Sequence, residues 1–284
     1  MDGAGSPPHS TIGRIESVRL SPHVPPALEA FLRSGRLVVA AGLIALTLLS
    51  WLYLALLAEA MSAMSVGDGS AYMWLMPMGA WGPAEFLLCF AMWAVMMIAM
   101  MTPSAAPMLF AFHALDRARP GRGSAARRFL AFLLGYVFVW TSFSVIAASV
   151  QWWLHEGAVV TDMMVSSSRV LDGAILLCAG IYQFMPAKSR CLSKCRTPMG
   201  FLLTEWRDGT GGALVMGVRH GSFCVGCCWA LMALLFVGGV MNLLWIALLA
   251  GAVLIEKVVP FGATVAKATG LLMFASGLWL LLSA

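Results

Sequence analysis

Charged residues are scarce in this sequence. Only 11% of the 284 residues are Asp, Glu, Lys or Arg, whereas 61% are hydrophobic. An average soluble domain carries roughly a quarter charged residues. This shortage excludes a soluble globular protein, and we expect an all-α, polytopic membrane helix bundle.

Two features of active transporters are missing. The sequence contains no Gly-rich phosphate-binding loop of the Walker type, so the chain itself has no motif for using ATP. We also find no internal repeat and no pair of similarly interrupted apolar segments, which are typical of inverted-repeat transporters. Active pumping would therefore require another subunit.

Long apolar runs are abundant. A spanning helix needs roughly 20 apolar residues, because the hydrocarbon core is about 30 Å thick and each residue rises about 1.5 Å. We expect about seven spans, with six and one re-entrant segment as the alternative. The runs cover residues 37–60, 84–112, 129–151, 170–187, 214–239, 241–259 and 264–283.

The distribution of basic residues predicts the orientation of the chain. Lys and Arg in short loops are retained on the cytoplasmic side of a membrane. With the N-terminus inside, all but one of the 18 basic residues fall on that side, and Arg169 is the exception. The first outer loop has no basic residue. We therefore expect N-in, C-out.

The N-terminal segment differs in composition from the rest. Residues 1–36 are rich in Pro, Ser and charge and have too few apolar side chains to form a core. We expect a disordered cytoplasmic tail over residues 1–36 and a single transmembrane helical domain over residues 37–284.

The most informative motif lies at the start of the fifth apolar run. His220, Cys224, Cys228 and Met232 follow one another at four-residue intervals, so a helix places them on one face, with Cys227 beside them. Thiolates and thioethers are soft ligands that select Cu(I). Cys is also a common buried small hydrophobe, but three thiols with a histidine one turn earlier favour a metal site.

A second thiol pair follows the fourth run. Cys191 and Cys195 are four residues apart, which aligns both thiols on one helical turn. Basic residues surround them, and nearby cations enrich the thiolate that binds metal. We expect both thiols to be metal ligands on the same side of the membrane as Cys224, although a basic surface loop with two incidental Cys is the alternative.

A row of methionines marks the second run. The thioethers share two adjacent rows of one helix face, which makes them a candidate low-affinity path for Cu(I), with ordinary core packing as the alternative. The predicted path consists of Met92, Met96, Met97, Met100 and Met101, followed by a predicted break at Pro103 and Pro107. Five further thioethers in or near the first outer loop are candidates for copper capture, with a short apolar cap on the bundle as the alternative. They are Met61, Met64, Met73, Met76 and Met78.

Three ionisable residues lie within or beside apolar runs. Burial of such a group costs several kcal/mol, so it is functional or paired by default. Glu256 and Lys257 either pair with the His220 region or extend to the interface, and the second interpretation is slightly favoured. Asp172 is predicted to pair with Arg169, three residues earlier.

Three segments carry a resemblance to a known family. MWAVMMIAMMTPSAAPM, YQFMPAKSRCLSKCRTPMGFL and MGVRHGSFCVGCCWALMALLFVGGVMNLLWIALLAGAVLIEK closely resemble the bacterial family called predicted metal-binding integral membrane protein, domain of unknown function 2182. The resemblance covers roughly residues 37–283. It implies a multi-pass protein of the bacterial inner membrane with a role in metal handling, in some descriptions as a copper chaperone.

The leading functional hypothesis is a non-enzymatic membrane protein that holds Cu(I) and transfers it through Met and Cys ligands. Copper is the expected metal, and zinc is the alternative because thiolate sites bind it in tetrahedral geometry. The expected partners are the lipid bilayer, the metal ion, and a copper-dependent membrane enzyme or another subunit. We expect no nucleic-acid partner.

Two other classes of function fit part of the sequence. A membrane thiol–disulfide oxidoreductase would use Cys224 and Cys227 as its reactive pair, with Cys191 and Cys195 relaying electrons. That chemistry needs neither the methionine row nor the predicted position of the thiols on the reducing side of the membrane. An assembly partner of a larger membrane complex is the third hypothesis, with Trp152 and Trp153 as a docking surface or, more simply, an interfacial belt.

Overall fold

The computed structural model describes residues 26–65, 82–119, 124–157 and 168–283. Within these ranges all regular structure is helical and no strand occurs, which confirms the predicted all-α class. The helices are α1 (Pro26–Ser65), α2 (Pro83–Ala118), α3 (Ala125–Glu156), α4 (Arg169–Phe184), α5 (Pro186–Arg196), α6 (Pro198–Glu205), α7 (Gly209–Ala233), α8 (Leu235–Gly238), α9 (Leu243–Val258) and α10 (Gly262–Leu282).

Five of the described segments are long and apolar enough to cross a membrane, and α4 with α5 makes a sixth if this bent pair is one span. The predicted count of seven is therefore not confirmed. The reason lies in α4 and α9, which have only 16 residues each. At about 1.5 Å per residue, each is shorter than the roughly 30 Å hydrocarbon core.

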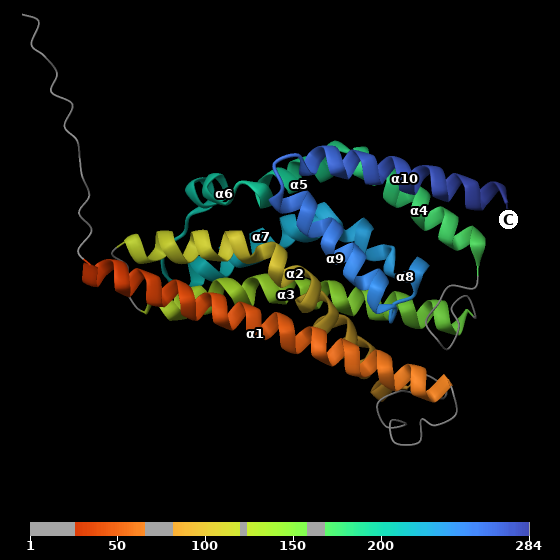
Figure 1. The fold of residues 1–284 in the computed structure, drawn as a ribbon, viewed down its shortest axis with the longest axis horizontal. Coiled ribbons are helices and arrows are strands. Elements are labelled where there is room, and N and C mark those ends of the chain that lie inside the picture. The colour runs from red at the N-terminus through yellow and green to blue at the C-terminus, as the bar shows by residue number, and fades with distance from the viewer. Residues whose placement is uncertain (1–25, 66–81, 120–123, 158–167, 284) are drawn as a thin grey trace, which may run out of the picture.

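The helices run side by side along the long axis of the molecule (Figure 1). The α1–α2 pair lies at one edge, the α4–α10 pair lies at the other, and α7 and α9 fill the space between them. α3 packs along α7 and also contacts α2. Because α7 contacts α3, α4, α5 and α9, its cysteines lie at the centre of the helix packing.

Glycines allow the two closest helix pairs to form. A Cβ built on Gly217 of α7 would lie 2.0 Å from the Phe132 carbonyl oxygen of α3, and one on Gly135 of α3 would lie 2.3 Å from the Leu214 oxygen of α7. At the α4–α10 contact, a Cβ on Gly180 would lie 2.7 Å from the Phe274 nitrogen. Small residues of this kind let helix backbones approach closely, as in membrane helix pairs.

Two parts of the predicted domain scheme need comment. Helix α1 begins at Pro26, before the predicted domain boundary at residue 36, while residues 1–25 lie outside the described ranges. The predicted break at Pro103 and Pro107 is wrong, because α2 continues through both prolines to Ala118. The neighbouring helices α1, α3 and α9 pack against α2 and support it there.

Candidate metal centre

Sulfur atoms from three helices lie close together in the core. The Sγ atoms of Cys195 on α5 and Cys227 on α7 are 4.0 Å apart. The Sγ atom of Cys228, also on α7, lies 4.0 Å from the Sδ atom of Met101 on α2. We call Cys195, Cys224, Cys227, Cys228 and Met101 the sulfur cluster, and all five side chains are buried.

A sharp bend in the chain brings Cys195 to α7. Helix α4 ends at Phe184, Met185 is extended, and Pro186 occupies the first turn of α5. A residue before proline is disfavoured in helical conformation, so the chain leaves the axis of α4 at this point. The two helix axes differ by 66°, and α5 packs against α7. The predicted spacing of Cys191 and Cys195 on one helical turn is thus realised within α5.

Hydrogen bonds hold the thiols of α7 in fixed positions. The Cys227 and Cys228 thiols both donate to the carbonyl oxygen of Cys224, at 3.1 and 2.9 Å. The Cys-x-x-Cys-Cys spacing produces this arrangement, because residues three and four apart share a helical face. Cys227 then faces Cys195, while Cys228 faces Met101.

Cys224 has two polar partners, Lys257, which agrees with the alternative interpretation of pairing with the His220 region, and Tyr136, which sequence reasoning missed. Lys257 of α9 donates from Nζ to the Cys224 sulfur at 2.9 Å and to the Ser104 hydroxyl at 3.1 Å. The hydroxyl of Tyr136 on α3 lies 3.2 Å from the same sulfur. The only sequence signal was the presence of Lys257 inside an apolar run. Tyr136 gave no signal.

The interpretation that Glu256 and Lys257 extend to the interface is wrong, because both side chains are buried. Glu256 forms an ion pair with Lys188 of α5 at 2.6 Å and accepts a hydrogen bond from the Gln183 amide at 3.0 Å. The two adjacent charges of α9 thus have separate roles. Glu256 ties α9 to α4 and α5, and Lys257 contacts the sulfur cluster.

His220 lies one turn before Cys224, inside a group of aromatic rings. Its ring stacks on Tyr136 at 5.6 Å and on Phe132 at 6.2 Å, and meets Phe201 edge-on at 5.6 Å. Within the described ranges its buried Nδ1 atom has no hydrogen-bond partner. The ring is therefore linked to Cys224 through Tyr136, and its role as a metal ligand stays a prediction.

The predicted methionine path is buried throughout. Met92, Met96, Met97, Met100 and Met101 of α2 are each at most 3% exposed. Met101 is the member that reaches a thiol. Of the predicted capture group, Met61 is buried at the end of α1. The positions of Met73, Met76 and Met78 and the side chain of Met64 lie outside what the structure describes.

The cysteines divide into three groups by position. Four belong to the sulfur cluster, and Cys191 is half-buried beside it on α5. Cys89 is buried on α2 and Cys178 is exposed on α4. The predicted pair of Asp172 and Arg169 involves none of these thiols, and it stays a prediction.

The cluster differs from a closed metal cage. Among the residues that the structure describes, no three Cys, His, Asp or Glu side chains are arranged to hold one metal ion. Structural zinc sites have four such ligands in tetrahedral geometry. The cluster instead presents sulfur in neighbouring pairs, Cys195 with Cys227 and Cys228 with Met101.

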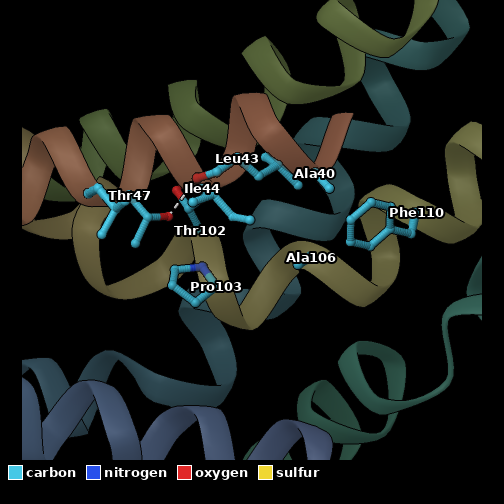
Figure 2. Close-up of a pocket in the computed structure, with 9 residues that line it drawn as sticks. Ala40, Leu43, Ile44, Thr47, Thr102, Pro103, Ala106 and Phe110 are labelled. Atoms are coloured by element: carbon cyan, nitrogen blue, oxygen red, sulfur yellow. Dashed lines mark hydrogen bonds between the residues drawn. The ribbon is translucent and has the colours of Figure 1, made fainter. Parts of the chain in front are cut away.

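A groove between α1 and α2 lies apart from the cluster (Figure 2). Its volume is about 420 Å³, and side chains of α1 face Pro103 and Phe110 of α2 across it. The lining residues are Ala40, Leu43, Ile44, Thr47, Leu48, Thr102, Pro103, Ala106 and Phe110. The lining contains no sulfur and no imidazole, so this apolar groove offers no soft metal ligand.

Comparison with known proteins identifies a family for the chain. No curated protein and no solved structure matches the chain. A family model described as PpoB2, copper chaperone, matches residues 90–280, which include α3 to α9, most of α2 and α10, and the whole sulfur cluster. The match confirms the resemblance inferred from the sequence, and the chain belongs to this copper chaperone family.

Proposed function

We propose that this protein is a membrane-embedded, non-enzymatic carrier that holds Cu(I) and transfers it between Cys and Met sulfurs. The observation that carries the proposal is the pair of 4.0 Å sulfur–sulfur distances in the cluster, Cys195 to Cys227 and Cys228 to Met101. Soft thiolate and thioether ligands select Cu(I) over harder ions. Membership of the copper chaperone family supports the same metal.

The two distances fit ligands that share one ion. Metal–sulfur bonds of about 2.3 Å, as in zinc–thiolate sites, separate two sulfurs by about 4 Å when the angle between the bonds is near 120°. Each pair therefore matches two ligands of a three-coordinate site without rearrangement of the helices. Because Cys227 and Cys228 are consecutive, an ion bound by one pair is next to the other pair.

The buried thioethers extend this route along α2. Beyond Met101, the chain offers Met100, Met97, Met96 and Met92 on the core side of the helix. A row of weak thioether ligands favours passage of the ion over its storage. We therefore assign the cysteines to holding the ion and the methionines to moving it to or from the far end of α2.

A membrane location is supported by the outer surface of the helices. Large apolar side chains on α1, α3 and α10 are more than 60% exposed, including Leu48, Phe138 and Leu271. Exposed apolar surface on this scale marks an interaction with lipid or another protein. With the bias in Lys and Arg, it supports a multi-pass protein of the bacterial inner membrane with its N-terminus inside.

Zinc fits the cluster less well than Cu(I). Tetrahedral zinc requires four ligands, whereas the described Cys, His, Asp and Glu side chains do not converge even in threes. We propose Cu(I) as the cargo on this basis.

The metal content of the purified protein tests the proposal. Protein from cells supplied with both copper and zinc should retain copper at a near-stoichiometric level. The double variant Cys195→Ser/Cys227→Ser should lose most of it, since both thiols of one pair are removed. Cys178→Ser, which changes an exposed cysteine on α4, is the matched control and should retain copper. Copper-free wild-type protein would rule the proposal out.

One observation favours a second function. The Cys195 and Cys227 sulfurs are close enough that a small movement would bring them to the roughly 2.05 Å of a disulfide. This is a different pair from the Cys224 and Cys227 expected from sequence for a thiol–disulfide oxidoreductase. Metal-free protein with a reversible Cys195–Cys227 disulfide would support that enzyme instead.

A further inference from the structure

Cys191 is a partly exposed neighbour of the sulfur cluster. It is half-buried, whereas Cys195, Cys224, Cys227 and Cys228 are buried. Cys191 lies one turn before Cys195 on α5 and therefore shares its helical face. Cys191 is thus the next sulfur along this face of α5 from the buried Cys195.

Gly226 allows Cys191 to lie directly against α7. A Cβ built on Gly226 would lie 2.8 Å from the Cys191 Sγ atom, so any larger residue would displace the thiol. Gly226 immediately precedes Cys227 in the chain. The hydroxyl of Tyr182 on α4 donates to the Gly226 carbonyl oxygen and fixes this part of α7. The thiol of Cys191 is thus held beside the cluster while part of its residue remains accessible.

The surroundings of Cys191 are positively charged. Arg190 precedes it and is exposed, and Lys194 lies one turn later on α5 and is half-buried. The other two cations of this helix are engaged elsewhere, Lys188 with Glu256 and Arg196 with the carbonyl oxygens of Val259 and Pro260. Arg190 and Lys194 therefore favour the approach of an anionic partner to this thiol.

We propose that Cys191 is the exchange thiol through which Cu(I) passes between the buried cluster and an anionic thiol complex of Cu(I) in the adjoining aqueous phase. The proposal rests on the proposed function and adds the point of exchange and the class of partner. In the loading direction, a bond from copper to Cys191 sulfur forms as one bond from copper to the donor thiolate breaks. The proton of the Cys191 thiol passes to the leaving sulfur, and copper stays Cu(I). A second exchange of the same kind moves the ion to Cys195 and Cys227.

Transfer kinetics test this role separately from copper binding. The probe is Cu(I) complexed by glutathione, an anionic thiol, mixed with metal-free protein in detergent. Cys191→Ser should reach the same final copper content as wild type, but roughly tenfold more slowly or slower still, because the accessible sulfur is gone. Gly226→Ala should also slow transfer, because the added methyl group displaces the Cys191 thiol. Cys178→Ser is the matched control and should transfer at the wild-type rate.

A charge-reversed variant tests the class of partner. Arg190→Glu/Lys194→Glu should slow transfer from the glutathione complex and leave transfer from the Cu(I) complex of the cationic thiol cysteamine unslowed. Equal slowing with both donors would overturn the anionic partner. A Cys191→Ser variant that transfers at the wild-type rate, or that loses copper at equilibrium, would overturn the role of Cys191. Wild-type protein that never takes up copper would instead overturn the proposed function.

Discussion

Glu256 and Lys188 form a buried ion pair where α9 meets α5. Each side chain is only 2% exposed, and the two charges are 2.6 Å apart. The Gln183 amide supports the carboxylate and also donates to the Thr269 hydroxyl of α10. One carboxylate thus links α4, α5, α9 and, through Gln183, α10. The position of α5, and therefore of Cys195, depends on it.

Removing one member of this pair should strongly destabilise the protein. We expect Glu256→Gln to lower the free energy of unfolding by about 3–5 kcal/mol, because it leaves the Lys188 ammonium buried without its counter-charge. The measurement is denaturant-induced unfolding in detergent micelles. The control is Arg219→Ala, which breaks the more exposed Arg219–Glu205 pair and should cost at most about 1 kcal/mol. Equal small effects of the two changes would refute the structural role of Glu256.

At this scale the sequence predicts the thiols but not their partners. The spacing of Cys224, Cys227 and Cys228 is a local property, so a helix determines which face each thiol takes. The contact between Cys224 and Lys257 joins residues 33 positions apart on different helices. No local pattern encodes that contact, and an apolar run with one lysine fits both burial and extension to the interface.

At the scale of elements, the packing of α3 against α7 positions Tyr136 beside Cys224. Gly135 and Gly217 permit that approach because their missing side chains leave room for the facing backbone. Hydropathy identifies both helices but gives no register between them. The 66° bend between α4 and α5 is likewise hidden in an apolar run that continues up to residue 187.

A methyl group at the α3–α7 contact should separate these helices. We expect Gly217→Ala to destabilise the protein by about 1–3 kcal/mol or more, because its Cβ would overlap the Phe132 carbonyl oxygen. It should also reduce copper retention, since Cys224 and its neighbours share α7 with Gly217. Gly251→Ala on α9 is the control. Nothing lies within 4 Å of that Cβ, and the change should be neutral or stabilising by up to about 1 kcal/mol. Similar unfolding midpoints for both variants would contradict the close contact.

At the scale of the whole molecule, composition alone predicts a helical membrane protein, but the number of spans depends on where helices end. The runs at 170–187 and 241–259 read as full spans, yet α4 and α9 have 16 residues each. Helix α4 ends just before Pro186, and α9 lies between the Asn242 cap and the extended Val259 that precedes Pro260. The apolar composition of a run does not predict where its helix ends.

Reporter fusions test the orientation of the bundle. We expect a periplasm-dependent phosphatase fused after residue 121 to be inactive, because Arg117 and Arg119, which precede the fusion point, keep this connection in the cytoplasm. The same reporter fused after residue 70 should be active. The reverse pattern would place the cysteines of α5 on the opposite side from the one we propose.

The central claim is that this protein binds copper as Cu(I) through sulfur. X-ray absorption at the copper K edge of the copper-loaded protein reports both the oxidation state and the atoms bound to the ion. The account predicts an edge of Cu(I) and a first shell dominated by two or three sulfur atoms. An edge of Cu(II), or a first shell of nitrogen and oxygen, would contradict it.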